Sequence, residues 1–154
     1  MKKRVLILGS TGSIGTSALT VARQIPDRME IVGLAAGTRV DDLEDQAKEF
    51  GVKHLCLADD SRYKELQKPG RVVYAGANGL VEIVEATQPD LVLVSIVGVE
   101  GLRPTLAAIE LGCDIAVASK EILVMAGEVV MNAAREKGVN ILPAVSYTHL
   151  TLPT

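Results

Sequence analysis

The chain has 154 residues, and its 16 lysines and arginines against 19 aspartates and glutamates give a formal charge of −3. A chain of this length forms one domain that buries roughly 70% of its unfolded surface without disulfides. Because no basic cluster follows Lys2, Lys3 and Arg4, nucleic acid and anionic membrane surfaces are not expected as partners.

Short apolar runs alternate with segments of helical periodicity along the chain. The first run, residues 4–8, ends in a glycine cluster, and residues 16–25 then place apolar side chains on one helical face. Further strands are predicted at residues 30–36, 53–58, 72–75, 91–97, 115–118 and 140–143, and further helices at 41–50, 79–86, 105–111 and 127–137. This alternation predicts an α/β domain, a Rossmann-like doubly wound sheet, mainly parallel, with helices on both faces.

Several residues outside the glycine cluster have simple structural interpretations. The nearly continuous apolar run at 91–97 predicts a strand near the centre of the sheet. We expect Met125 and Met131 to fill the core and His54 to be structural. The domain is predicted to span residues 1–143, whereas residues 144–154 carry no charged side chain, continue no period, and are expected to be a foreign or disordered tail.

The two cysteines and two histidines show no spacing typical of a metal site. Cys56 and Cys113 lie in apolar runs, where a thiol packs like a small apolar side chain. Free, buried cysteines are typical of a reducing compartment, so we expect a cytoplasmic protein. No apolar stretch is long enough to span a membrane.

The glycine cluster has the spacing G-x-x-G-x-x-G and stands between the first predicted strand and helix. Dinucleotide-binding folds hold a pyrophosphate at this place. Gly9 would permit the tight turn, Gly12 the close approach of the phosphates, and Gly15 the packing of helix on sheet. A plain strand-to-helix turn can also use glycines, but the position of the cluster in the alternation favours nucleotide binding.

The end of the second predicted strand distinguishes between the two nicotinamide dinucleotides. An NAD site has a carboxylate there for the ribose 2′-hydroxyl, but here none occurs before Asp41. Arg39 instead offers a guanidinium that matches a 2′-phosphate. The sequence therefore predicts NADP, with an ordinary solvated surface arginine as the alternative.

The segment Ser119-Lys120-Glu121 follows a predicted buried strand. Ligands of open α/β sheets bind at the carboxyl ends of strands, so Lys120 is a candidate for an anionic substrate and Ser119 and Glu121 for the cofactor. An equally simple alternative is that Ser119 caps the following helix and Glu121 favours its N-terminal dipole.

Four segments together resemble one enzyme family. They are GSTGSIG at residues 9–15, IVGLAAGTRV at 31–40, SIVGVEGLRPTLAAIELG at 95–112 and ASKEILV at 118–124. In this order they resemble the N-terminal domain of the 1-deoxy-D-xylulose 5-phosphate reductoisomerases, from about residue 3 to Pro143. The resemblance implies an NADPH- and divalent-metal-dependent enzyme of non-mevalonate isoprenoid biosynthesis, which isomerises and reduces its phosphorylated sugar substrate to 2-C-methyl-D-erythritol 4-phosphate.

The resemblance also implies roles for single residues. Thr11, Gly12, Ser13 and Ile14 match the family's NADPH pyrophosphate loop, and Gly37 matches the glycine near the adenosine phosphate.

Two positions depart from the family pattern. Arg39 stands where the family usually has Asn, although its charge suits a phosphate. Ser119 replaces the Asn of an Asn-Lys-Glu triplet, in which Lys120 matches the substrate-contacting lysine and Glu121 the NADPH-contacting glutamate.

The family's metal ligands have no counterpart in this sequence. After Pro143 the family continues with Asp-Ser-Glu, whereas this chain has Ala144, Val145, Ser146 and Tyr147, so that Ser146 falls at the family's serine and neither carboxylate is present. Mg²⁺, Mn²⁺ or Co²⁺ would need carboxylate oxygens. We therefore predict no catalytic residue and no metal ligand here, and expect a truncated product that lacks the catalytic and C-terminal domains and has no turnover.

Other interpretations remain open from the sequence. The complete enzyme is expected to be a homodimer, while the oligomeric state of this fragment is not predicted. A free-standing, non-catalytic nucleotide-binding module and another NADP-dependent reductase are the alternatives, because a fold alone does not fix a function.

Overall fold

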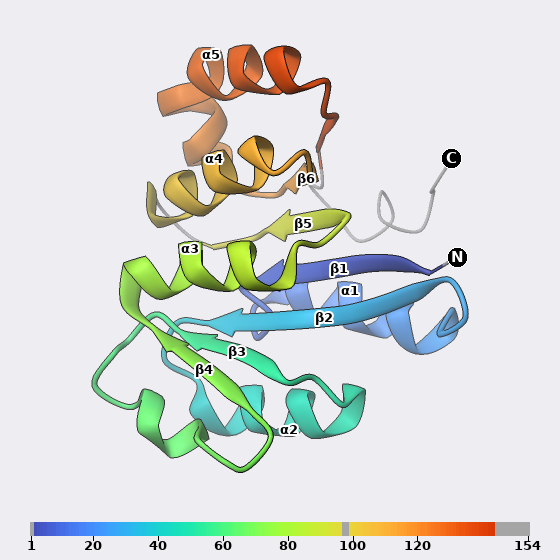
Figure 1. Ribbon diagram of the computed structural model, residues 1–154, viewed down its shortest axis with the longest axis vertical. Helices are drawn as coiled ribbons and strands as arrows, with labels where there is room; N and C mark the ends of the chain where they lie inside the picture. Colours follow the sequence, from blue (N-terminus) through green and yellow to red (C-terminus); the bar gives the residue numbers. More distant parts are fainter. Residues whose placement is uncertain (1, 97–98, 144–154) are drawn as a thin grey trace.

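The computed structural model describes residues 2–96 and 99–143, in which strands and helices alternate (Figure 1). The strands are β1 (Lys3–Leu8), β2 (Met29–Ala36), β3 (His54–Leu57), β4 (Val72–Ala75), β5 (Leu91–Val94), β6 (Asp114–Val117) and β7 (Ile141–Pro143). The helices are α1 (Ser13–Gln24), α2 (Val40–Phe50), α3 (Gly76–Thr87), α4 (Leu102–Glu110) and α5 (Lys120–Lys137), with short 3-10 turns η1 (Tyr63–Leu66) and η2 (Val99–Gly101). The predicted α/β class is confirmed.

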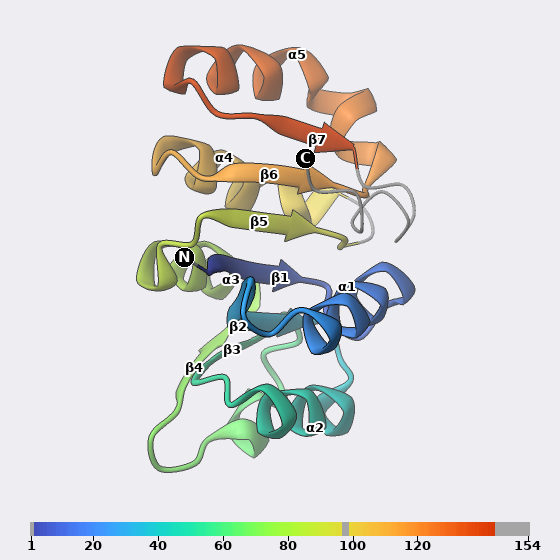
Figure 2. The ribbon, with the colours of Figure 1, turned by 90° about the vertical axis from the view of Figure 1, so that its right-hand side faces the viewer.

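The strands form one sheet in the order β4-β3-β2-β1-β5-β6-β7, and every neighbouring pair is parallel. The order reverses between β1 and β5, which is the switch point of a doubly wound sheet. Leu8 pairs with Val94, and Val94 pairs with Val117, so β1, β5 and β6 end level with one another. The segments that follow these strands therefore open at the same edge of the sheet (Figure 2).

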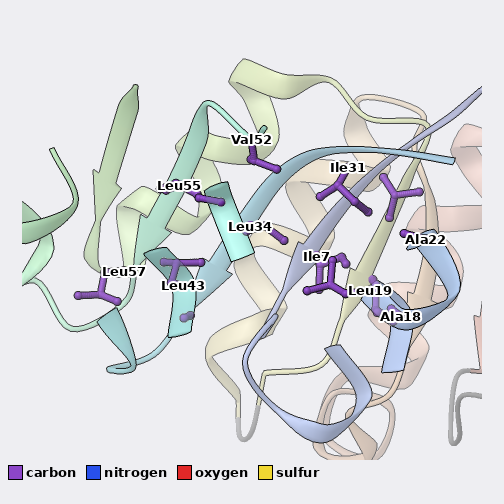
Figure 3. Close-up of a cluster of buried hydrophobic side chains, with 14 of the residues drawn as sticks. Ile7, Ala18, Leu19, Ala22, Ile31, Leu34, Leu43, Val52, Leu55 and Leu57 are labelled. Atoms are coloured by element: carbon purple, nitrogen blue, oxygen red, sulfur yellow. The ribbon is translucent and has the colours of Figure 1, made fainter. Parts of the chain in front are cut away.

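Helices cover both faces because side chains alternate along each strand. Ile7 and Leu34 point into the cluster beneath α1 and α2, where Leu19 and Leu43 meet them (Figure 3). Their neighbours on β1, such as Leu8, belong to a second cluster that α3, α4 and α5 cover. This double coverage explains the uninterrupted apolar runs in the sequence.

Helix α5 begins earlier than the sequence predicts. The predicted helix 127–137 is only its second half, because Ser119 is already the N-cap and Lys120 opens the first turn. Ala126 has non-helical angles (φ −136°, ψ 21°), which kink the helix where the prediction placed its start. The first half was missed because its apolar side chains do not share one buried face.

The expectation that Met125 and Met131 fill the core is wrong. Their side chains are 70% and 41% exposed. The inward side of α5 is formed by residues spaced at multiples of four, Ile122, Val130 and Ala134, and both methionines lie off this stripe.

Strand β5 is shorter than the predicted 91–97 and ends at Val94, but it lies beside the central strand β1 as expected. Residues 97–98 and the predicted tail 144–154 lie outside the described residues.

Cys56 and Cys113 are buried, and burial raises the pKa of Cys56 to about 12 and also raises the pKa of Cys113. No helix in the described ranges is both long and apolar enough to cross a bilayer.

A partly buried ion-pair network fastens α2 to the segment before β4. Glu44 accepts a hydrogen bond of 2.7 Å from Arg71 Nη1, and Lys68 Nζ lies 3.2 Å from its other oxygen. The side chains of Glu44 and Arg71 are only 16% and 11% exposed. The Arg71 hydrogen bond, helped by Lys68, lowers the pKa of Glu44 from 4.5 to about 2.

Replacing Glu44 with Gln should reduce the free energy of unfolding by about 2 kcal/mol at neutral pH. Because the pKa of Glu44 is lowered in the fold, its contribution is complete above pH 4.5 and disappears as the pH falls toward 2. Urea denaturation between pH 7 and 3 measures this. Glu65→Gln is the matched control, since Glu65 and its partner Arg62 are both about half exposed, and it should leave the free energy of unfolding nearly unchanged. A Glu44→Gln effect independent of pH would contradict the assignment.

Candidate functional site

The glycine cluster forms a tight turn between β1 and α1, and two of its glycines are required by packing. Gly9 has φ +96°, and a Cβ there would lie 2.7 Å from the Ser95 carbonyl oxygen. A Cβ on Gly15 would lie 2.2 Å from the Gly9 carbonyl oxygen. These two glycines therefore let the first turn of α1 lie directly on the end of the sheet.

Gly12 is different, because neither its backbone nor its packing requires a glycine. Its angles are φ −80° and ψ 178°, which any residue adopts. A Cβ there would meet only the Gly9 carbonyl oxygen, at an ordinary 3.7 Å, and the residue is exposed. The space beside Gly12 is open, as a backbone position approached by a ligand requires.

The N-terminus of α1 presents backbone amides that the protein leaves unbonded. The amides of Gly9 and Ser10 both donate to the Ala35 carbonyl, and α1 has neither a capping side chain nor an acidic residue in its first turn. Across the described residues, no acceptor serves the amides of Thr11, Ser13, Ile14 and Gly15. Unbonded amides at the positive end of a helix form a site for an anion.

Arg39 lies beside this turn. It is the N-cap residue of α2, and its Nη1 donates to the Thr11 carbonyl oxygen at 3.2 Å. Its Nε lies 3.5 Å from an oxygen of Asp42, and its side chain remains 65% exposed. Gly37 is also exposed, with open space where a Cβ would be. The structure thus brings together the glycine cluster and the second predicted site, 28 residues apart in sequence.

The Ser119 segment lies at the same edge of the sheet, because Val117 is level with Val94 and Leu8. Ser119 is 6% exposed and occupies the N-cap position of α5, but its hydroxyl donates to a Glu121 carboxylate oxygen at 2.8 Å rather than to a helix amide. The capping alternative is therefore right about the position and wrong about the bond. Lys120 lies in the first turn, and its side chain is outside the described part of the molecule.

Two residues that bond to the turn were not predicted from the sequence. Ser95, the residue after β5, donates its hydroxyl to the carbonyls of Leu8 and Gly9 at 2.9 and 3.2 Å. Gln46, in the middle of α2, donates to the Ser10 carbonyl at 3.0 Å. A signal for Gln46 existed, since it is a polar residue on the helical stripe that carries the buried Leu43 and Ala47.

The described residues offer no metal centre, because nowhere in them do three histidine, cysteine, aspartate or glutamate side chains come together. A hollow of about 840 Å³ lies at the other end of the sheet, where Lys3, Asp90 and Asp114 stand at the starts of β1, β5 and β6. His54 is part of neither site, since its Nδ1 is 3.1 Å from the Tyr74 hydroxyl and burial lowers its pKa.

Residues 5–127 match the family model of 1-deoxy-D-xylulose 5-phosphate reductoisomerase. The chain belongs to this family. The reductoisomerase of Phocaeicola vulgatus is 46% identical over 151 residues, which are 95% of this chain and 39% of that protein. The chain therefore spans about two fifths of this relative's length.

Solved reductoisomerases have the same fold as this chain. The Zymomonas mobilis enzyme in complex with NADPH superimposes with a TM-score of 0.86 at 39% identity, covering 93% of this chain and 38% of that one. A reductoisomerase in complex with NADPH, fosmidomycin and magnesium also gives 0.86 at 39% identity, over 92% of this chain and 36% of that one. The Rossmann-like α/β fold expected for a reductoisomerase is thereby confirmed.

Gly15→Ala should lower the free energy of unfolding by about 1–3 kcal/mol, because the added methyl group collides with the Gly9 carbonyl. Gly12→Ala, where the space is open, should change it by about 0.5 kcal/mol or less. Urea denaturation followed by circular dichroism measures both. Equal losses for the two variants would show that the turn is not packed as described.

Proposed function

We propose that the chain is the NADPH-binding domain of a 1-deoxy-D-xylulose 5-phosphate reductoisomerase, the enzyme that isomerises and reduces this sugar phosphate to 2-C-methyl-D-erythritol 4-phosphate. The observation that carries the proposal is Gly12. The fold has no use for a glycine there, yet the residue stands beside unbonded amides at the start of α1. A pyrophosphate in contact with the backbone explains both features.

In the proposed site, three segments of the chain contact different parts of the cofactor. Thr11, Gly12, Ser13 and Ile14 hold the pyrophosphate through backbone amides and, at Thr11 and Ser13, hydroxyl groups. The adenosine 2′-phosphate lies against Arg39, next to Gly37, whose exposed backbone leaves room for it. The NADPH complexes of two family members support this arrangement.

The Ser119 segment completes the proposed site from the neighbouring strand. Ser119 and Glu121 already share a hydrogen bond of 2.8 Å, which fixes the two side chains relative to each other. Lys120 contacts the anionic substrate. When bound, NADPH supplies the hydride for the reduction.

Metal-dependent steps are not part of this domain in the proposal. The described residues bring no three metal-ligating side chains together, so they do not fit a divalent cation, and we derive no step through one. The family's longer members, of which this chain spans about two fifths, have room for separate catalytic and C-terminal domains beyond an NADP-binding domain at 1–143. We place the complete enzyme in the cytoplasm as a homodimer.

The family membership favours this proposal over another NADP-dependent reductase. A free-standing nucleotide-binding module, the other alternative, has no observation of its own in its favour.

NADPH should bind the chain at least tenfold more tightly than NADH, and Arg39→Ala should remove most of this difference, because a charged hydrogen bond to the 2′-phosphate is lost. Calorimetric titration measures both affinities. Arg62→Ala is the control, since Arg62 is an exposed arginine paired with Glu65 outside the site. Equal affinities of the unaltered chain for the two cofactors would refute the assignment to NADP.

The chain by itself should show no turnover with 1-deoxy-D-xylulose 5-phosphate and Mg²⁺ or Mn²⁺, since no cluster of metal ligands is present in its described residues. The loss of NADPH absorbance measures turnover, with a full-length family member as the positive control. Oxidation of NADPH that depends on the substrate would overturn the proposal that this chain binds the cofactor but lacks turnover.

A further inference from the structure

Gln46 makes a contact that neither the family resemblance nor the proposed site assigns. From the middle of α2 its Nε2 donates to the Ser10 carbonyl oxygen at 3.0 Å, across 36 residues of sequence. Ser10 is fully buried at the base of the glycine turn. The contact therefore joins α2 to the turn from its protein side.

The same two residues hold buried polar atoms that the fold leaves unbonded. The Ser10 hydroxyl and the Gln46 Oε1 are both buried, and neither has a partner within the described residues. A buried polar atom without a partner costs about 1–3 kcal/mol. Because the stripe of α2 around Gln46 carries Leu43 and Ala47, an apolar side chain would avoid this cost. What an apolar side chain would not provide is the donor for the Ser10 carbonyl, and this one hydrogen bond is the contact that the Gln46 amide makes.

The geometry of the peptide bond shows what the contact does. In a trans peptide the carbonyl and the N–H of the same unit point in opposite directions. The Ser10 carbonyl shares its peptide plane with the Thr11 N–H, which is one of the amides without an acceptor in the described chain. By holding the carbonyl from beneath, Gln46 fixes the direction in which the Thr11 N–H points.

Arg39 acts on the next peptide in the same way. It donates to the Thr11 carbonyl, so two side chains at the beginning and middle of α2 hold two successive carbonyls of the turn. Meanwhile the Ala35 carbonyl accepts both the Gly9 and Ser10 amides. The β2–α2 unit thus bonds the turn at the Gly9 and Ser10 amides and at the Ser10 and Thr11 carbonyls, while Ser95 after β5 bonds the Leu8 and Gly9 carbonyls.

We propose that Gln46 is a positioning residue of the dinucleotide site, which aims the Thr11 N–H at the pyrophosphate by holding the Ser10 carbonyl. This inference rests on the proposed NADPH function. It adds a residue that does not touch the cofactor and acts through the backbone of the turn.

The test compares two ligands on the full 154-residue chain. Gln46→Met keeps the length of the side chain and removes its donor. It should weaken NADPH binding about tenfold, the effect of one hydrogen bond. Adenosine 2′-monophosphate, which has the 2′-phosphate but no pyrophosphate, should bind unchanged in an NMR titration. Gln67→Met, at an exposed glutamine after η1, is the matched control and should alter neither affinity.

The outcomes are separable. If the unaltered chain fails to bind NADPH, the proposed function and this inference fall together. If the unaltered chain binds but Gln46→Met binds NADPH equally well, only the inference is overturned. Equal weakening of NADPH and adenosine 2′-monophosphate would show a merely structural role and would also overturn it.

A second variant covers the case in which Gln46→Met does not fold. Gln46→Glu keeps the shape, but its ionised carboxylate cannot donate to the Ser10 carbonyl and regains a donor only when protonated. Its NADPH affinity, taken relative to the unaltered chain at the same pH, should be at least tenfold lower at pH 8 and should recover as the pH falls toward 5. Burial raises the pKa of a carboxyl group at such a position. A ratio independent of pH would overturn the proposal.

Discussion

The close contact between Gly15 and the Gly9 carbonyl is the constraint on which the rest of the site depends. With only 2.2 Å to an added Cβ, the first turn of α1 is as near to the end of β1 as a backbone can come. That approach puts the start of the helix at the switch point, beside the end of β5, where Ser95 bonds back to the turn. A larger residue at Gly15 would lift α1, and its unbonded amides would no longer lie at the level where the neighbouring strands end.

The starts of α1 and α2 carry opposite electrostatic arrangements, which explains why only one of them needs an arginine. The first turn of α1 has no acidic residue, so its positive end is available to an anion. The first turn of α2 holds Asp41 and Asp42, which offset the helix dipole and would repel a phosphate nearby. Arg39, 3.5 Å from Asp42, counters that charge at the place where the proposed adenosine phosphate lies. An arginine at position 39 is thus suited to its own local surroundings.

The sequence predicts those parts of the molecule that local patterns encode. The apolar runs located every strand, and the glycine spacing located the turn, because strand burial and tight turns depend on neighbouring residues. The first half of α5 was missed, since Val124 and Met125 are exposed and give no one-sided period. Ser95 and Gln46 were missed for another reason. Their contacts span 87 and 36 residues, and only the order of the strands brings those segments together.

The strand order also explains how one domain can provide donors for a dinucleotide without providing ligands for a metal ion. Parallel strands on either side of the switch point end at one edge, so β1, β2 and β6 each place a segment at that edge without any change in the core. The donors of these segments are amides, hydroxyls and a guanidinium, which suit phosphates and not a hard divalent cation. The carboxylate of Glu121 accepts a hydrogen bond from the Ser119 hydroxyl at 2.8 Å. The geometry of this edge is therefore suited to holding phosphate groups, and nothing in its described donors is suited to a hard divalent cation.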